Sequence, residues 1–349
     1  MTNPSTTYLA PGDIFAKHYR IERALGEGAM GTVVAARHAD TGERVAIKCL
    51  LPIHRDDRGI VARFQREARA TLRINSEHVA RVLEHGETPL HGAPGGAPVL
   101  YLVMEHLEGC DLRSYLAQRG SLSVRRAAEF VSQACVALAE AHALGIIHRD
   151  LKPANLFHSR QRDGSSLIKV LDFGIAKFQS PNTSGDALEV TACASTMGSL
   201  QYMAPEQLLD ARSVDGRADV WSLGVILYLL VSGVRPFNGD VVTDLAFEVL
   251  TGAPRPLSEV APFAPPEFVA VVMRCLNKRR EDRCPSMVEL ARALAPFAQR
   301  PASAPRLQLG LRTARLSRAE LLLSLDAAAR SLPANDDLDG PPTRRMLPA

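Results

Sequence analysis

The chain has 349 residues, of which 46% are hydrophobic, as is typical of a globular protein with a substantial core. Its 41 basic and 38 acidic residues give a formal charge of +3, so the composition gives no indication of nucleic acid or an anionic membrane as a partner. The six cysteines form no C-x-x-C pair and no zinc-spaced set, which argues against a disulfide framework and predicts free thiols in a reducing cytosol.

The N-terminal third is expected to consist mainly of strands. Residues 1–18 are polar and contain proline, so we expect a flexible leader there. Over residues 19–103, apolar and polar residues mostly alternate as they do in strands. One helix is predicted over residues 57–74, where apolar side chains recur with helical spacing. The Gly- and Pro-rich loop 88–98 is expected at the surface.

From residue 104 the pattern changes to helix. Apolar residues recur with helical spacing over 123–144, 205–209, 218–233, 241–250, 265–276 and 286–298. The most apolar stretch, 220–234, is shorter than the ~20 residues that cross a bilayer, so a buried helix is predicted.

The two ends of the chain differ from this middle part in composition. Residues 299–349 are rich in Pro, Ala and Arg and are expected to form a largely disordered tail, with one short amphipathic segment over 317–332. The N-terminus has no secretory signal, and a cytoplasmic protein without a membrane anchor is expected.

A glycine-rich segment lies near the start of the strand-like region. Gly26, Gly28 and Gly31 fit the pattern G-x-G-x-x-G. In a dinucleotide-binding fold this turn opens a helix, but here the strand-like segment TVVAARH follows. A glycine-rich turn between two strands can instead cover phosphates, because its main-chain N–H groups approach them without obstruction by Cβ. The pattern alone leaves both interpretations open.

Three further motifs follow in order: VAIK, which contains Lys48; HRDLKPAN over 148–155; and DFG over 172–174. An isolated lysine in an apolar strand would ordinarily extend to the surface. The other two motifs could individually be ordinary turns. Their joint occurrence in this order favours a shared function.

Together these motifs resemble the signature of protein kinases. Over about residues 19–298 the chain is similar to eukaryotic-type (Hanks-type) serine/threonine protein kinases, most of all to the bacterial members. The resemblance implies an α+β, bilobal protein-kinase fold, with a small β-rich N-lobe (19–103) containing one main helix and a larger, mostly helical C-lobe (104–298). It also implies transfer of the γ-phosphate of ATP, with Mg²⁺, to serine or threonine hydroxyls of protein substrates.

The resemblance gives the residues of the second and third motifs their roles. Asp150 would orient the substrate hydroxyl, and Lys152 would neutralise charge on the transferred phosphoryl group and indicates Ser/Thr rather than Tyr specificity. Asn155 and Asp172 would hold Mg²⁺, which prefers oxygen ligands. His148 is expected to be structural, buried beneath the loop.

The nucleotide site would lie between the two lobes. Lys48 would hold the α- and β-phosphates and would itself be held by Glu67 on the first helix. The linker YLVMEHLEG would present main-chain groups to the adenine edge. Four apolar residues would surround the adenine, but core packing is an alternative role for them: Val33, Ala46, Met104 and Phe157. The resemblance implies these binding residues: Gly26, Glu27, Gly28, Ala29, Gly31, Val33, Ala46, Lys48, Glu67, Met104, Glu105, Leu107 and Phe157.

The segment from Asp172 to Glu206 ends in the A-P-E landmark and is rich in Ser and Thr. Such a stretch is ordinarily a mobile surface loop. In the family, the arginine at position 149 receives a phosphate from this segment, so we expect autophosphorylation at Thr191, Ser195 or Thr196. Ser199 is expected to be a structural hydroxyl that bonds to Asp150 and Lys152.

Further matches concern the framework of the large lobe. Asp219 is expected to brace the loop formed by the motif 148–155, called the catalytic loop below. Trp221 is expected to pack in the large lobe, and Arg283 is expected to pair with Glu206. The residue at 154 is alanine where some kinases with basic substrates carry glutamate, so no preference for arginine-containing substrates is indicated.

Two alternatives from other functional classes remain. One is a catalytically inactive, kinase-like scaffold that binds partners through its tail. The other is a small-molecule phosphotransferase on the same fold, against which the complete activation segment argues. The tail is a candidate docking segment for a partner or for the kinase itself, and a merely solvated tail is an equal alternative.

Overall fold

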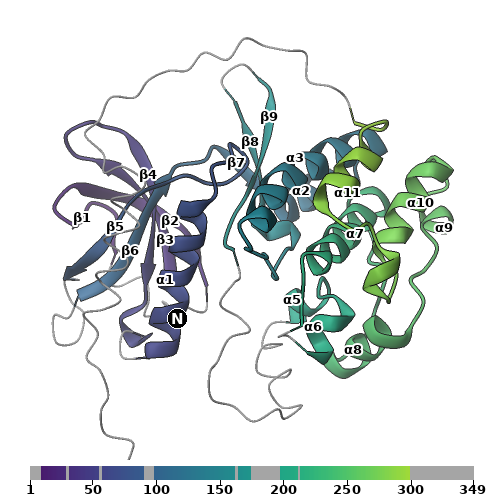
Figure 1. Cartoon of the computed structure of the whole chain (residues 1–349). Coiled ribbons are helices and arrows are strands. Elements are labelled where there is room, and N and C mark those ends of the chain that lie inside the picture. The colour runs from purple at the N-terminus through teal and green to yellow at the C-terminus, as the bar shows by residue number, and fades with distance from the viewer. Residues whose placement is uncertain are drawn as a thin grey trace, which may run out of the picture.

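The computed structural model describes residues 9–28, 31–54, 57–89, 98–161, 164–173, 197–210 and 213–298, and these form a small lobe and a large one (Figure 1). The small lobe is mainly a β-sheet with one long helix, and the large lobe is mainly helical. The predicted α+β, bilobal architecture is therefore confirmed. The tail 299–349 lies outside the described residues.

The small lobe is built on an antiparallel six-stranded sheet in the order β1-β2-β3-β4-β6-β5. Its apolar side chains alternate between the two faces, as the sequence pattern predicts. The strands are β1 (Ile14–Phe15), β2 (Tyr19–Glu27), β3 (Gly31–His38), β4 (Arg44–Leu50), β5 (Val82–Pro89) and β6 (Pro98–Glu105).

The sheet begins before residue 19, which differs from the leader expected over 1–18. Ile14 pairs with Arg20, so the first strand is a short edge strand of the same sheet. Leu9 and Phe15 are almost fully buried in the core of this lobe. The burial of these two apolar side chains explains why this polar-looking segment is structured.

Helix α1 (Arg58–Arg73) carries Glu67, the predicted partner of Lys48. The carboxylate of Asp57 caps the helix by accepting a hydrogen bond from the Ile60 N–H at 3.0 Å. Its apolar face packs on the sheet through Val61, Phe64, Ala68 and Leu72. The helix predicted over 57–74 is confirmed.

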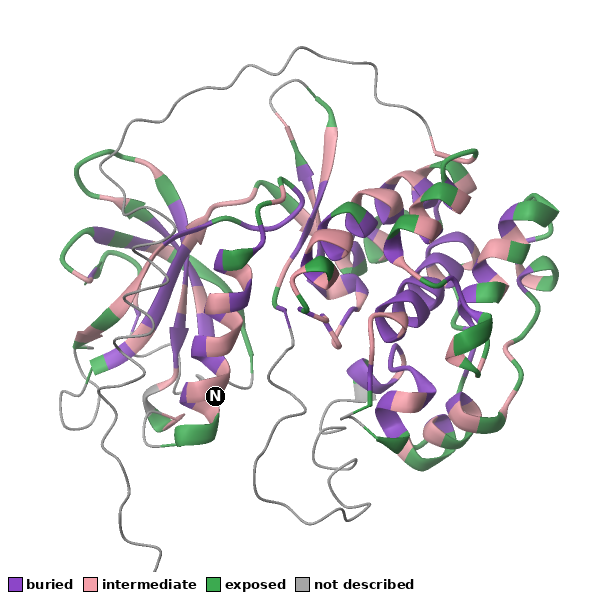
Figure 2. Ribbon diagram, viewed as in Figure 1, coloured by how far each residue is buried: buried purple, intermediate pink, exposed green. Residues whose placement is uncertain are grey.

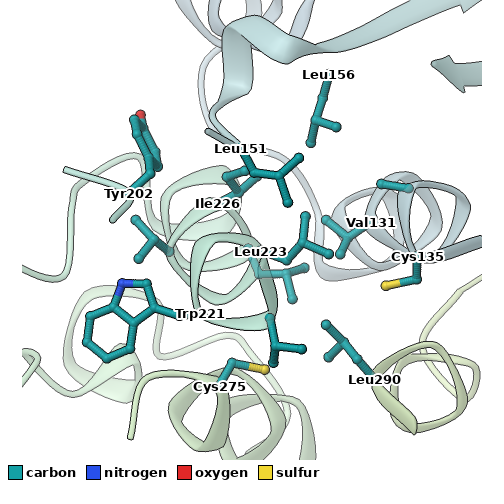
Figure 3. Packing of buried hydrophobic residues seen from close by; sticks show 14 of the residues in the cluster. Val131, Cys135, Leu151, Leu156, Tyr202, Trp221, Leu223, Ile226, Cys275 and Leu290 are labelled. Atoms are coloured by element: carbon teal, nitrogen blue, oxygen red, sulfur yellow. The ribbon is translucent and has the colours of Figure 1, made fainter. Parts of the chain in front are cut away.

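The large lobe surrounds helix α7 (Arg217–Ser232), nearly all of which is buried (Figure 2). Figure 3 shows Trp221, Leu223 and Ile226 of α7 packed among residues of neighbouring helices and of the catalytic loop, such as Leu151. The other helices are α2 (Leu112–Arg119), α3 (Val124–Ala143), α5 (Met197–Leu200), α6 (Pro205–Leu209), α8 (Val242–Thr251), α9 (Leu257–Val260), α10 (Pro266–Cys275) and α11 (Met287–Leu294).

A second, three-stranded sheet was not predicted. It consists of β7 (Gly109–Asp111), β8 (Leu156–Arg160) and β9 (Ser166–Val170). It lies on the side of the large lobe that faces the small lobe (Figure 1). Its place matters for function because β8 directly follows the 3₁₀ helix Pro153–Asn155 and β9 directly precedes the segment 171–173. Among the described residues, no helix is both long and apolar enough to cross a membrane.

Candidate active site

The motif 148–155 forms a loop that brings Asp150 and Lys152 together. The Lys152 Nζ lies 3.0 Å from the Asp150 Oδ2 and donates a hydrogen bond to the Ser199 Oγ at 3.1 Å. The predicted contact between Ser199 and Lys152 is therefore confirmed. The Lys152 cation thus sits between the Asp150 carboxylate and the segment that contains Ser199.

Asp219 fastens this loop from within the large lobe. Its carboxylate is fully buried and accepts hydrogen bonds from the main-chain N–H groups of His148 and Arg149, both at 2.9 Å, and contacts the His142 Nε2 at 2.8 Å. Burial favours the neutral acid, but these hydrogen bonds outweigh it and lower the pKa of Asp219. The Arg149 backbone has a φ of 65°, a strained conformation that these bonds stabilise. The predicted brace is confirmed.

His148 is a structural residue, as expected. It is fully buried, its ring Nε2 lies 3.0 Å from the Leu171 carbonyl oxygen, and its Nδ1 accepts from the Asp150 N–H at 3.3 Å. The ring packs against Phe173 with centroids 4.9 Å apart. Burial lowers the pKa of His148, so the ring is neutral near pH 7.

A second group of charged residues spans the two lobes. The Lys48 Nζ from β4 lies 2.6 Å from the Glu67 Oε1 of α1 and 2.8 Å from the Asp172 Oδ1, which follows β9. Lys48 therefore does not extend into solvent. The contact with Glu67 was predicted and that with Asp172 was not, and the two carboxylates meet Lys48 from opposite lobes.

The charges of this group depend on one another. Burial opposes the charged form of Lys48, but the two carboxylates outweigh it and raise its pKa. The Lys48 cation lowers the pKa of Asp172 to about 2. Burial raises the pKa of Glu67 to about 7, against the opposing effect of Lys48. Asp172 is thus ionised near neutral pH, whereas Glu67 titrates there.

The glycine-rich turn lies at the start of β3. Gly28 donates its N–H to the Gly31 carbonyl at 2.8 Å, which closes the turn. A Cβ at Gly31 would stand 2.2 Å from the Cys49 carbonyl oxygen of β4, so this position requires glycine. The turn joins strands β2 and β3, which supports the phosphate-lid interpretation over a dinucleotide-binding turn. Ala29 lies outside the described residues.

The residues expected to hold adenine come from both sheets. Val33 of β3 lies opposite Lys48, and Ala46 lies opposite Met104 of β6. Leu107 is half-buried in the linker that follows β6. Phe157 of β8 pairs with residues of both β7 and β9. Their role in nucleotide binding stays a prediction.

Sequence reasoning missed a charged contact behind the linker. The Glu105 side chain lies 2.6 Å from the Lys169 Nζ of β9, and it accepts the Arg81 N–H at 2.8 Å. The Glu105 N–H donates in turn to the Arg81 carbonyl at 2.9 Å. Lys169 is almost fully buried, and its place in an otherwise apolar strand was the available signal. The pair joins the linker to the strand that leads to Asp172.

Oxygen ligands for a divalent cation are present near the catalytic loop. The Asn155 Nδ2 donates to the Asp150 carbonyl at 2.8 Å, so its amide oxygen is free for another role. The Asp172 side chain is 53% exposed and ionised. One amide oxygen and one carboxylate fit Mg²⁺, which usually keeps several waters and phosphate oxygens as its other ligands.

The end of the activation segment is anchored in the large lobe. Arg283 is fully buried at its side chain and binds Glu206 with both nitrogens, at 2.7 and 2.8 Å. The guanidinium also lies over the Trp221 ring, 5.0 Å from its centroid. The predicted pair is confirmed. Gly174, Thr191, Ser195 and Thr196 lie outside the described residues.

Comparisons with known proteins agree with this geometry. Residues 19–293 match the family model described as "Protein kinase domain". The serine/threonine-protein kinase pkn3 of Myxococcus xanthus is 38% identical over 295 residues, which are 84% of this chain and 52% of that protein. PknB of Mycolicibacterium smegmatis is 36% identical over 272 residues, 78% of this chain and 41% of that protein. The chain spans about half the length of the curated relatives it matches.

Solved structures give the same result. The crystal structure of the PknI kinase domain of Mycobacterium tuberculosis aligns with a TM-score of 0.59 and 29% sequence identity. The alignment covers 83% of this chain and 100% of that one.

Proposed function

Since the chain belongs to the bacterial Hanks-type serine/threonine protein kinases, we propose that it transfers the γ-phosphate of ATP, with Mg²⁺, to serine or threonine hydroxyls of other proteins and of itself. The observation that carries the proposal is the arrangement of Lys152 between Asp150 and Ser199, together with the contacts of Lys48 to Glu67 and Asp172. An inactive scaffold has no need of either arrangement.

Each charged group has a defined task in this reaction. The Asp150 carboxylate orients the substrate hydroxyl and accepts its proton, and the Lys152 cation beside it offsets negative charge on the transferred group. Phosphoryl transfer needs positioning and charge neutralisation rather than covalent help from the protein, and these residues supply both.

The nucleotide and metal would be held from both lobes. Lys48 would bind phosphate oxygens, the turn at Gly26, Gly28 and Gly31 would cover them, and the linker main chain at Glu105 and Leu107 would meet the adenine. Asn155 and Asp172 would hold Mg²⁺, which neutralises phosphate charge when bound. The Asp172 carboxylate already contacts Lys48, so this carboxylate would serve both Lys48 and a bound Mg²⁺.

Autophosphorylation of the activation segment forms part of the proposal. A phosphoryl group adds about −1.5 to −2 charge, which Arg149 could receive beside the catalytic loop. The candidate residues are Thr191, Ser195 and Thr196. Docking of the tail and a cytoplasmic location stay predictions.

The test is transfer of labelled γ-phosphate from Mg·ATP to the protein itself and to a generic basic protein. The wild type is expected to incorporate label as phosphoserine or phosphothreonine, and Asp150→Asn, which keeps the side-chain shape, is expected to incorporate none. Nucleotide binding without any transfer by the wild type would favour the scaffold. Undiminished activity after alanine replaces all three candidate residues would contradict activation by autophosphorylation.

A further inference from the structure

A cavity of about 500 Å³ lies where the end of α1, the loop that joins α1 to β5 and the end of β6 meet. Cavities of roughly 300–1,000 Å³ are large enough to take up a small molecule or several side chains of a partner. The side chains that act in the proposed reaction, such as Lys48, Asp150 and Lys152, do not line this one. It therefore has no role in the function described so far.

Apolar side chains form the buried part of the lining. Leu72, Ile74 and Val79 all line the cavity, and each is at most 4% exposed. Glu77 and Arg81 also line it and are exposed, so they lie at its edge. Protein interfaces have the same arrangement, in which a polar edge surrounds an apolar centre. The cavity is therefore suited to apolar side chains on a segment that also carries charges.

The charges around the cavity are balanced. Glu105 and Lys169, which line it as well, form an ion pair with each other at 2.6 Å. Glu77 and Arg81 add one negative and one positive charge. A segment with a strong charge of one sign would meet both attraction and repulsion here. A segment of mixed charge with an apolar side matches this lining better.

Residues 317–332 of this chain have that pattern. Ser317 and Glu320 have the spacing of a capping box and Pro333 follows the segment, so the sequence predicts a helix over 318–332. This helix would carry equal numbers of basic and acidic residues. Apolar residues recur along one side of it with helical spacing: Leu321, Leu322, Leu325, Ala328, Ala329 and Leu332.

The segment is long enough in its connection to reach the cavity. The described part of the chain ends at Ala298, which is 19 positions before Ser317. An extended connection of this length spans about 60 Å, more than the roughly 50 Å diameter expected of a domain of this size. An isolated helix of this length is only marginally stable in water, so its apolar side needs a surface to cover it. The cavity provides such a surface.

We propose that the helix predicted over residues 318–332 docks in this cavity of the same chain, with Leu321 and Leu325 inserted among its apolar side chains. The wall of the cavity includes the end of α1, the helix that carries Glu67. The docked segment therefore holds in place the helix that supplies the partner of Lys48. The docking itself needs no phosphoryl transfer, so it can be tested apart from the proposed function.

The experiment is hydrogen–deuterium exchange on the full chain without nucleotide. In the wild type, the amides of residues 318–332 should exchange slowly, because the docked helix is protected. Leu325→Gln removes an apolar side chain from the docked side. Exchange over 318–332 should become about tenfold faster, and exchange over the cavity loop 74–81 should also become faster. Leu323→Gln makes the same change on the opposite side of the predicted helix and should leave both segments at wild-type rates.

Each contrary outcome would overturn the proposal. Rapid exchange over 318–332 in the wild type would show that this segment does not dock. Equal effects of Leu325→Gln and Leu323→Gln would show that the predicted apolar side does not hold it. Faster exchange of the tail without a change over 74–81 would place the docking elsewhere on the molecule. Protection that is lost on dilution would assign the contact to a second copy of the chain. The labelled γ-phosphate experiment tests the kinase function separately.

Discussion

The catalytic loop and the cluster of Lys48, Glu67 and Asp172, called here the Lys48 group, both serve the proposed reaction. The protein holds the two in different ways. The loop is fastened from inside one lobe by Asp219, which is fully buried. The Lys48 group joins three elements from two lobes, and one member, Asp172, is 53% exposed. The loop geometry should therefore depend on folding of the large lobe, whereas the Lys48 geometry should depend on pH, metal and the approach of the lobes.

The largest expected effect concerns the ion pair between Arg283 and Glu206, which anchors the end of the activation segment. Like Asp219, Arg283 is buried inside the large lobe. Arg283→Met leaves the Glu206 carboxylate without its bidentate partner, and the free energy of unfolding should fall by about 3–5 kcal/mol. Urea unfolding measures this change. Arg280→Met is the matched control, because Arg280 is 33% exposed at its side chain, and it should cost less than about 1 kcal/mol. Equal losses in the two variants would contradict the buried anchor.

The next effect tests the brace of the catalytic loop. Asp219→Asn turns an amide N–H towards groups that are themselves donors, so the free energy of unfolding should fall by about 3 kcal/mol. Phosphoryl transfer should fall as well, since the loop loses its support. Asp215→Asn is the control, because that carboxylate is 41% exposed and pairs with Arg217 near the surface. If Asp219→Asn were as stable as wild type, the loop would not depend on this carboxylate.

Lys48→Met should separate activity from stability. Transfer should fall roughly a hundredfold or more, equivalent to about 2.7 kcal/mol in the barrier, because the phosphates lose their cation. The free energy of unfolding should change by less than about 1 kcal/mol, because the Asp172 partner is half exposed and Glu67 can take up a proton. Kinetics and urea unfolding of one preparation provide both values. If the free energy of unfolding of Lys48→Met fell by several kcal/mol, Lys48 would contribute to stability as the buried residues Arg283 and Asp219 do, which would contradict this prediction.

The two regions were also predictable from sequence to different degrees. The catalytic loop lies in one short motif, so the relative positions of Asp150, Lys152 and Asn155 follow from local chain geometry once the motif is recognised. The long helices were predictable too, because the buried side of α1 or α3 repeats with helical spacing.

Contacts between distant segments could not be predicted in this way. Lys169 and Glu105 are 64 positions apart, and no local pattern links them. The strands β7, β8 and β9 are three to five residues long, too short for alternation to distinguish them from loops. The Ser222 hydroxyl of α7 meets the Tyr202 carbonyl only because α7 and the segment before α6 pack together. Such features follow from tertiary packing.

The smallest expected effect is the pH dependence of the Lys48 group. Burial raises the pKa of Glu67 to about 7, and only the ionised carboxylate holds Lys48 as an ion pair. Between pH 7 and 6, kcat/KM for ATP should therefore fall by up to about tenfold towards the value of Glu67→Gln, while above pH 7 it should level off. Asp172, with a pKa of about 2, stays ionised throughout this range. Glu67→Gln should have a lower rate without this titration.

The same titration should change stability in the opposite direction. The Glu67 carboxyl titrates at about 7 in the folded protein and at 4.5 as an unperturbed side chain, so the folded state binds the proton more tightly. Its contribution to the free energy of unfolding is greatest below pH 4.5 and is lost as the pH rises through 7. The Tm of wild type minus that of Glu67→Gln should decrease over this range while activity rises. A pH-independent Tm difference and a flat rate profile would show that Glu67 does not titrate between pH 4.5 and 7, and would contradict the expected pH dependence of the Lys48 group.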